Sequence, residues 1–180
     1  MALRKASSYS KFSARPYTRK SSKKSKSYIK TVPPQKVVKL QMGNISAYNQ
    51  GKFSIIISLM STENVQMRDN AIEAARQSIH KELEVAFPNQ YYFGVKVYPH
   101  HILRENRMLT GAGADRMQTG MTQSFGTTIG RAALVKPNQT IFVIAVNSEK
   151  AVQVTRKAIS KIKAKLPCKT RIQTEKIKQE

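Results

Sequence analysis

Residues 140–166, TIFVIAVNSEKAVQVTRKAISKIKAKL, contain the two hydrophobic periods that decide the fold class. Residues 140–146 are a short, almost continuous apolar run, which is typical of a buried strand. Asn147 or Ser148 is a candidate N-cap, and Glu149 falls in the first helical turn, where the helix dipole favours an anion. Apolar residues then recur at helical spacing and predict one buried stripe: Val152, Ile159, Ile162 and Leu166.

An earlier segment also predicts a strand followed by a helix. Residues 52–60 carry three consecutive isoleucines, residues 55–57, which favour a strand. Ser61 or Thr62 offers an N-cap, and Glu63 would lie in the first turn. The predicted helix extends to about Ala86, with Pro88 closing it, and has these apolar residues at helical spacing: Val65, Ile72, Ala75, Ile79, Leu83 and Ala86.

Four further segments are predicted to be strands: residues 35–40, 91–98, 131–136 and 168–173. In residues 91–98, Tyr91, Phe93, Val95 and Val97 should point one way and Lys96 and Tyr98 the other. Pro137-Asn138 is a turn signal between residues 131–136 and 140–146. The predicted fold is α+β, with two helices packed on a mixed, mainly antiparallel sheet.

The charge balance indicates a polyanionic partner. The chain has 32 Lys+Arg against 10 Asp+Glu, a formal net charge of +22, which destabilises a compact fold unless a polyanion neutralises it. Nucleic acid is the first candidate and an anionic membrane surface the second. The longest apolar runs, residues 55–57 and 141–146, are far shorter than the ~20 residues that span a bilayer. The single Cys168 excludes an internal disulfide and a Cys-based metal cluster, and fits a reducing cytoplasm.

The N-terminal arm, residues 1–34, concentrates this charge. Residues 1–62 contain 13 Lys or Arg and no Asp or Glu. The arm has too little apolar surface to offset the entropy of ordering, so alone it is expected to be disordered. Against RNA, its cations would meet phosphates and its aromatic rings could stack on bases. Its candidate RNA-binding residues are Arg4, Lys5, Lys11, Arg15, Tyr17, Arg19, Lys20, Lys23, Lys24 and Lys26.

Two other interpretations of the arm fit its composition less well than RNA binding does. A solvated, flexible tail explains a charge run, but the complete absence of acids favours a polyanion partner. An organellar transit peptide is also basic and rich in serine. The arm lacks the amphipathic stripe of such peptides, and Pro16, Pro33 and Pro34 interrupt any helix.

The second predicted helix carries a row of cations. Lys150, Lys157, Lys161 and Lys165 lie seven, four and four residues apart, so they share the face away from the apolar stripe. Like charges at this spacing are mildly destabilising on an isolated helix. Simple solubility is one explanation, and a stripe that faces phosphates explains the uniform sign better.

A long loop, residues 100–130, separates the two halves. It holds five of the eight glycines, at positions 111, 113, 120, 126 and 130, together with Arg104, Arg107 and Arg116, and Arg131 follows it directly. Glycines let a backbone approach a ligand closely, and arginine forks suit phosphates or guanine edges. A loop of this length is usually functional or disordered. No GxGxxG or GK[ST] fingerprint is present, so a nucleotide-cradling loop is not predicted.

No constellation of catalytic side chains is visible. His100 and His101 are adjacent, so a strand would send them to opposite faces, and His80 lies far along the chain. Glu105 and Asp115 could form a carboxylate dyad, but each has a nearby arginine, which favours salt bridges. Because no nucleophile, base and orienting group come together, we predict no enzymatic activity, no cofactor and no metal site.

Residues 99–126, PHHILRENRMLTGAGADRMQTGMTQSFG, closely resemble archaeal and eukaryotic large-subunit ribosomal proteins called "L ten e", relatives of bacterial "L sixteen". Residues 15–20 (RPYTRK), 70–76 (NAIEAAR) and 165–171 (KLPCKTR) support the resemblance, which covers roughly residues 15–173. The absence of the longer eukaryotic C-terminal extension favours the archaeal form. Residues 21–27, SSKKSKS, depart from the family pattern and make the path of the arm the least transferable part.

The resemblance implies a hammerhead-type α+β sandwich in the cytoplasm, seated on large-subunit rRNA near the A site and central protuberance. It implies support of tRNA accommodation and late subunit maturation, neighbouring ribosomal proteins as partners, and no homo-oligomer. By matching position, Arg104, Arg107, Arg116 and Arg131 would contact RNA, and Asp115 would anchor the loop locally. The loop near tRNA would comprise Thr110, Gly111, Ala112, Gly113, Ala114, Asp115, Arg116, Met117, Gln118, Thr119, Gly120, Met121, Phe125 and Gly126.

The expected organisation is an arm, one domain and a short tail. Residues 1–34 are the basic arm, residues 35–173 are a single rRNA-binding domain that includes loop 100–130, and residues 174–180 are a C-terminal tail. The alternative function is a free RNA chaperone or annealing protein that uses the same basic arm. Both hypotheses predict RNA binding with strong salt dependence.

Overall fold

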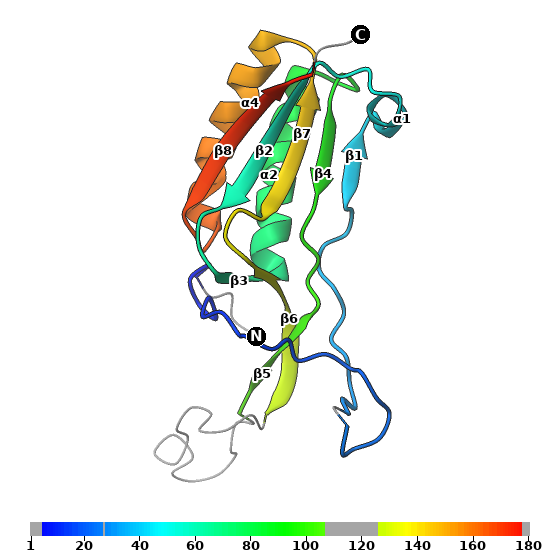
Figure 1. Cartoon of the computed structure of the whole chain (residues 1–180), viewed down its shortest axis with the longest axis vertical. Helices are drawn as coiled ribbons and strands as arrows, with labels where there is room; N and C mark the ends of the chain where they lie inside the picture. The colour runs from blue at the N-terminus through cyan, green and yellow to red at the C-terminus, as the bar shows by residue number, and fades with distance from the viewer. Residues whose placement is uncertain (1–4, 27, 107–125, 178–180) are drawn as a thin grey trace.

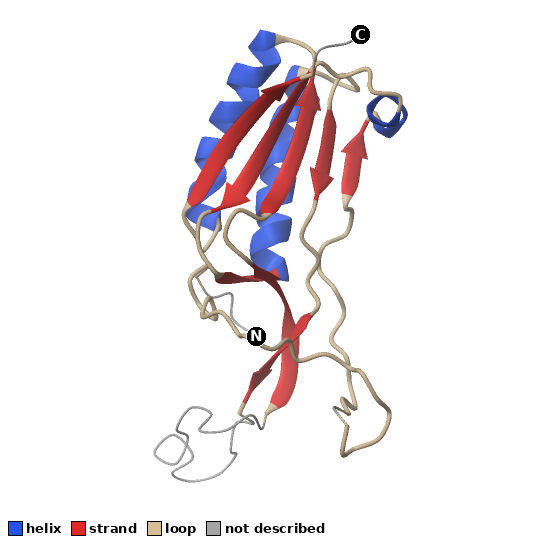
Figure 2. Cartoon of the chain, in the orientation of Figure 1, coloured by secondary structure: helices blue, strands red, loops and turns tan. Residues whose placement is uncertain are grey.

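A computed structural model describes residues 5–26, 28–106 and 126–177 (Figure 1). These residues form two sheets and three α-helices (Figure 2). The five-stranded sheet has the order β1-β4-β7-β2-β8, with bounds Gln41–Gly43, Tyr92–Val95, Thr140–Val146, Ile55–Ser61 and Thr170–Lys176. The three-stranded sheet has the order β3-β6-β5, with bounds Val65–Arg68, Thr127–Val135 and His101–Glu105.

The α+β class is confirmed, but the single mixed sheet is wrong. Every strand pair in the described residues is antiparallel, and the strands divide into two sheets. Between β6 and β7 the chain turns at Pro137 and Asn138, where Asn138 has a φ of 60°. Proline cannot donate to a strand ladder, so the two strands are separated and enter different sheets.

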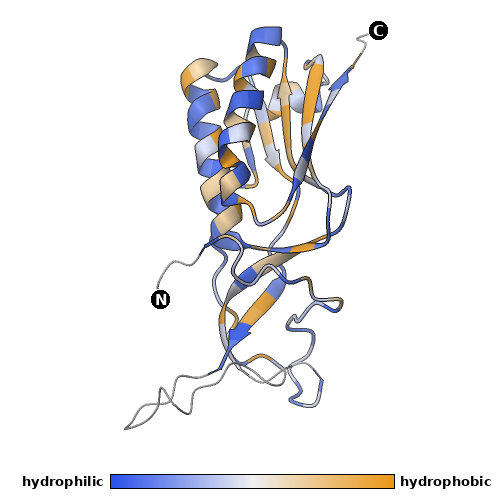
Figure 3. Cartoon of the chain, turned by 90° about the vertical axis from the view of Figure 1, so that its left-hand side faces the viewer, coloured by the Kyte–Doolittle hydropathy of each residue, from blue (hydrophilic) through white to orange (hydrophobic). Residues whose placement is uncertain are grey.

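Two long helices cover one face of the five-stranded sheet. They are α2, Asp69–Ala86, and α4, Glu149–Ile162, which continues as a short 3-10 turn, η1, over Lys163–Lys165. Figure 1 shows the strands in front of both helices, and Figure 3 shows hydrophilic colour on the outer turns of the helices. The core lies between the five-stranded sheet and the two helices. It includes the fully buried side chains Ile57, Ile79, Phe142 and Ile159. The predicted stripe of α4 therefore faces the core.

The start of α2 differs from the prediction. The sequence placed the helix directly after Ser61 or Thr62, whereas Val65–Arg68 is a strand and the helix begins at Asp69. Val65 and Met67 are buried at 3% and 0% exposure, and β3 pairs with β6. Pairing with a distant strand therefore overrides the local helical spacing, and Asp69 rather than Glu63 supplies the anion in the first turn.

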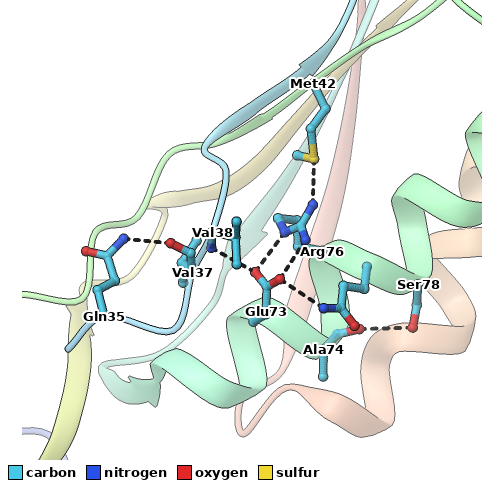
Figure 4. Close-up of polar contacts among 9 residues, drawn as sticks. Gln35, Val37, Val38, Met42, Glu73, Ala74, Arg76 and Ser78 are labelled. Atoms are coloured by element: carbon cyan, nitrogen blue, oxygen red, sulfur yellow. Dashed lines mark hydrogen bonds and ion pairs between the residues drawn. The ribbon is translucent and has the colours of Figure 1, made fainter. Parts of the chain in front are cut away.

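Residues 35–40 are not a strand, contrary to the prediction, because side chains of α2 take their backbone donors. Lys36 N donates to Asp69 Oδ2 (3.3 Å), and Val38 N donates to Glu73 Oε2 (3.4 Å). Glu73 is also bound by Arg76, whose Nε and Nη2 donate at 2.7 and 2.6 Å (Figure 4). The segment is thereby attached to α2, and sheet pairing begins only at β1.

A short helix, α1 (Ile45–Asn49), was missed by the sequence analysis. Asn44 caps it, because its Oδ1 accepts a hydrogen bond from Ala47 N at 2.9 Å. The Tyr48 ring of α1 stacks on Tyr92 of β4, with centroids 3.8 Å apart and ring planes 10° apart. The helix thus covers one end of the sheet face that lies opposite α2 and α4.

The predicted loop over residues 100–130 is shorter than expected at both ends. His101–Glu105 forms β5 and β6 begins at Thr127, so both flanks pair as strands. The expected periodicity was hidden because His101, Ile102 and Leu103 are all buried. Residues 107–125, which hold most of the predicted glycine-rich segment, lie outside the described residues.

Candidate nucleic-acid interface

The first part of the arm is hydrogen-bonded to β3. Gln66 contributes two contacts: its backbone N donates to Ser10 O (3.0 Å) and its Nε2 donates to Tyr9 O (2.7 Å). Arg68 Nη2 donates to Lys5 O at 2.8 Å, and its guanidinium lies 5.9 Å from the Tyr9 ring centroid. The composition predicted disorder for the isolated arm, whereas these contacts satisfy its backbone acceptors on the folded body. None of these contacts uses a cationic side chain of the arm.

Tyr17 attaches the middle of the arm to β5. Its N donates to His101 Nδ1 at 2.8 Å, and its O accepts from Ile102 N at 2.9 Å. Its ring lies under the Arg104 guanidinium, with Cζ 3.6 Å from the ring centroid. The N–H groups of a stacked guanidinium point outward in its own plane, so they remain available to acceptors beside the aromatic ring. Tyr17 therefore acts first as the support of a predicted RNA-binding arginine.

The contact with Tyr17 also fixes the protonation state of His101. A backbone amide only donates, so Nδ1 must be the accepting nitrogen, and the neutral ring carries its proton on Nε2. Burial lowers the pKa of His101 from its ordinary value, and the neighbouring His100 and Arg104 charges lower it further. The attachment of the arm therefore favours neutral His101.

The end of the arm is attached to β6. Thr128 Oγ1 donates to Thr31 O at 2.9 Å, and Arg131 Nε donates to Pro33 O at 2.7 Å. Ile29 is buried at 3% exposure. Residues 18–26 therefore leave the body after Tyr17, and residues 28–31 return to it, as the lower right of Figure 1 shows. The exposed cations between these attachments are Arg19, Lys20, Lys23, Lys24, Lys26 and Lys30.

The lysine row of α4 is exposed but only partly available. Lys150, Lys157, Lys161 and Lys165 are all exposed. Lys161 Nζ lies 3.0 Å from Glu82 Oε1 of α2, and Lys165 Nζ donates to Ser78 Oγ. Two members of the row thus contact the neighbouring helix, which the sequence pattern did not indicate.

The described carboxylates interact with other groups of the same chain. Asp115 and Glu180 lie outside the described residues, and each of the remaining eight acidic side chains has an intramolecular partner: Glu63, Asp69, Glu73, Glu82, Glu84, Glu105, Glu149 and Glu175. Within the described residues, by contrast, the arm's lysines and arginines form no ion pair with a carboxylate. The charge left for an external partner is positive.

The family model described as Ribosomal protein L16p/L10e matches residues 15–173. The chain belongs to the L16p/L10e family of ribosomal proteins. Similar proteins are named large ribosomal subunit protein uL16. The one from Hyperthermus butylicus is 43% identical over 170 residues, 94% of this chain and 88% of the relative. The one from Staphylothermus marinus is 42% identical over 173 residues, 96% of this chain and 93% of the relative. The one from Methanococcus maripaludis is 41% identical over 180 residues, 99% of this chain and 98% of the relative.

Membership of the L16p/L10e family confirms the resemblance recognised in residues 99–126. It also confirms the prediction that the chain is not an enzyme, since the family consists of ribosomal proteins. One polar cluster joins α2 to the start of β4, with Tyr91 buried, His80 partly buried and Glu84 exposed. Tyr91 Oη donates to Glu84 Oε2 at 2.6 Å and lies 2.7 Å from His80 Nδ1. Burial, followed by Glu84, raises the pKa of Tyr91 well above its ordinary value.

The predicted RNA-binding residues of this L16p/L10e chain fall into three groups. Arm residues 5–26 and the arginines of β5 and β6 lie together at one end of the molecule. The lysines of α4 lie on the helix face of the other end. Arg4, Arg107, Arg116, Asp115 and the loop residues 110–125 lie outside the described residues, and Gly126 is partly buried just before β6. Sequence reasoning missed His101, Gln66 and Arg68, which carry no signal other than polarity.

In the described part of the chain, no group of three or more His, Cys, Asp or Glu side chains could hold a metal ion. None of the helices described is long and apolar enough to cross a bilayer.

Proposed function

We propose that the chain is a structural constituent of the large ribosomal subunit and binds large-subunit rRNA through its basic arm. The names of its uL16 relatives support the location. The separation of charge carries the binding argument, because the described carboxylates have partners within the fold while the arm's cations have no carboxylate partner there. A protein that arranges its charges in this way needs a polyanion to offset the self-repulsion.

Subunit fractionation tests this function. The chain should co-sediment with large subunits and remain there after a moderate salt wash. If it neutralises ~6–10 phosphates, its rRNA affinity should fall ~10³–10⁵-fold between about 50 and about 200 mM salt. A free RNA chaperone would wash off and bind unrelated RNA equally well. Recovery of the chain mainly in the ribosome-free fraction would rule out the main hypothesis.

We further propose that the chain lies near the A site and central protuberance, beside neighbouring ribosomal proteins, and supports tRNA accommodation and subunit maturation. The resemblance in residues 99–126 supports this finer placement. Arg104 and Arg131 belong to this interface, since they lie on β5 and β6 and are positioned by Tyr17 and Pro33 of the arm. The arm and the two strands thus form one unit.

Deletion of residues 111–123 tests the tRNA role. The core of the described residues is supplied by the two long helices and the strands, so we expect the purified variant to retain the thermal transition of the wild type within a few degrees. Subunits should incorporate the variant but accommodate tRNA slowly. An unfolded variant would show that the segment is structural, and normal tRNA accommodation would remove the proposed role.

A further inference from the structure

The five-stranded sheet has a face without helices, which we call the open face. Directly paired residues on neighbouring strands share a face, so the register gives this face row by row. The middle row is Gln173, Ser58, Val143, Gly94 and Gln41, and the upper row is Glu175, Ile56, Ala145, Tyr92 and Gly43. The lower row is Arg171, Met60 and Lys96; Arg171 pairs with Met60, and Lys96 N donates to Ile141 O at 2.9 Å.

The intervening residues establish which way these rows point. Ile172 packs against the core, and Thr174 Oγ1 accepts from Arg156 of α4 at 3.1 Å, so Arg171 and Gln173 point away from the helices. Val95 and Val97 belong to the core cluster, so Lys96 between them points away as well. Both lower-row cations are exposed. In Figure 1 the open face is turned toward the viewer, with the strands in front of α2 and α4.

The lower part of the open face is cationic, whereas the helix face is mixed. Lys96, Arg171 and the exposed Lys169 just before β8 lie there, and its two lower rows contain no carboxylate. The helix side carries Glu82 and Glu149, which pair with lysines. The lower end is also continuous with the arm, since one surface hollow is lined by Lys5 to Ser7 together with Glu63, Cys168 and Lys169. The arm therefore shares a surface with the lower end of the sheet, and Lys5, Lys169 and Arg171 outnumber Glu63 there.

We propose that the lower two rows of the open face bind the ribose–phosphate backbone of structured rRNA, as an extension of the arm's interface. This inference rests on the proposed function. Lys96 and Arg171 would contact phosphates on either side, and Ser58 and Gln173 would hydrogen-bond ribose hydroxyls between them. Strands β4 and β8 are three strand spacings apart, about 14 Å. That separation suits the phosphates flanking the wide, shallow minor groove of an A-form helix, which displays 2′-hydroxyls.

A protein partner fits this face less well. The large, exposed apolar side chains of the described residues are Val38, Leu40, Ile45, Val85, Tyr98 and Ile177, and none belongs to the three rows. The centre instead carries small residues: Ser58 is half-buried, Val143 is 7% exposed, and Gly94 is buried against the Tyr92 side chain. Stable protein interfaces need an apolar or aromatic anchor in their centre. A surface of small and polar residues bordered by cations matches a sugar–phosphate backbone.

The upper row marks the limit of the proposed contact. Tyr92 is 1% exposed because Tyr48 stacks on it, so α1 already covers this end. Glu175 also lies in this row and would repel phosphate, while its carboxylate accepts a hydrogen bond from Gln173 at 2.8 Å. RNA is therefore expected on the lower and middle rows only.

Binding of the full chain to transcribed large-subunit rRNA tests the proposal. Lys96→Gln with Arg171→Gln should weaken binding about 5-fold per lost phosphate at about 0.1 M salt and lower the salt slope by about 0.7–0.9 per contact. Lys81→Gln with Lys163→Gln is the matched control, because both lysines are exposed outside this face and the change in net charge is identical. Ser58→Glu should weaken binding strongly, and Gln90→Glu in the exposed turn after α2 should not. Thermal melting establishes that each variant is folded.

Three results are informative. A larger loss for the open-face pair than for the control pair supports the proposal. Equal losses would show that only total charge matters and overturn it. Unchanged rRNA affinity with impaired incorporation into subunits would assign the face to a protein and also overturn it. If the wild type itself does not bind rRNA or co-sediment with large subunits, the proposed function fails instead.

Discussion

Glu73→Ala should be among the most destabilising single substitutions in this protein. Glu73 and Arg76 are only 8% and 7% exposed, and the carboxylate accepts from Arg76 at 2.7 and 2.6 Å, Gln77 at 3.0 Å and Val38 N at 3.4 Å (Figure 4). Its removal leaves a buried guanidinium whose remaining acceptor is Met42 Sδ at 2.9 Å, a weak one. Breaking a buried ion pair in this way costs about 3–5 kcal/mol.

Replacement of both partners separates the cost of an orphaned charge from the value of the pair. Glu73→Leu with Arg76→Met removes the charge and keeps the volume, so the variant should lie within about 1–2 kcal/mol of the wild type or exceed it. The exposed pair of Lys161 and Glu82 is the control. Its side chains are 68% and 28% exposed, so Glu82→Gln should cost less than about 1 kcal/mol.

Urea denaturation followed by far-UV circular dichroism gives the free energies of unfolding. The pH dependence provides a second check. The bidentate contact with Arg76 holds the pKa of Glu73 below its ordinary value of 4.5. Its contribution is therefore complete above that value and is lost as the pH falls through the lower, folded-state pKa. A cost below about 1 kcal/mol for Glu73→Ala, or a double variant no better than the single one, would refute this reasoning.

Three other predictions follow from the arm and from the glycines. Tyr17→Ala should raise amide exchange in the arm about 2- to 5-fold, corresponding to about 0.5–1 kcal/mol of lost cation–π energy, and Tyr17→Phe should not; equal exchange in both would contradict the stacking role. Acidification below about 6.5 should loosen the arm, because folding lowers the pKa of His101 and the stability of the neutral form is present above that value; His101→Gln should remove the pH dependence measured by amide exchange. Gly43→Ala should cost at least about 2 kcal/mol, since Gly43 has a φ of +78° and a Cβ would lie 2.2 Å from Tyr91 O. Gly130→Ala, where a Cβ meets open space, should change the melting temperature little.

Local sequence patterns predicted the elements whose environment is simple. Strand β7 was predicted with its observed bounds, because it is buried on both faces and reads as a continuous apolar run. The alternation in residues 91–98 was also correct: Tyr91, Phe93 and Val97 are at most 2% exposed, while Lys96 and Tyr98 are exposed. In both cases the pattern of burial along the strand is visible in the local sequence.

The errors arise where distant side chains satisfy the backbone. Residues 35–40 have a strand-like composition, but Asp69 and Glu73 accept their N–H groups, and no local signal reveals acceptors so far along the chain. Residues 65–68 have helical spacing, yet pairing with β6 makes them a strand. The arm contacts were hidden for the same reason, since Tyr17 binds a histidine 84 positions away. The sequence identifies the candidate RNA-binding cations, but it does not reveal which segments position them.

The acidic residues explain why such a basic chain folds as it does. Eight described carboxylates would offset little of the charge of 32 Lys and Arg residues if they were scattered on the surface. Instead Asp69 and Glu73 receive backbone donors of residues 36 and 38, and Glu63 receives the backbone N of Lys169 at 2.9 Å. Each therefore joins segments that strand pairing leaves unconnected. Because these carboxylates accept hydrogen bonds inside the fold, the positive charge remains on the arm and on the lower open face. The two uses are coupled: a substitution that removes a joint should weaken rRNA binding as well as folding, whereas neutralising a surface cation should weaken binding alone.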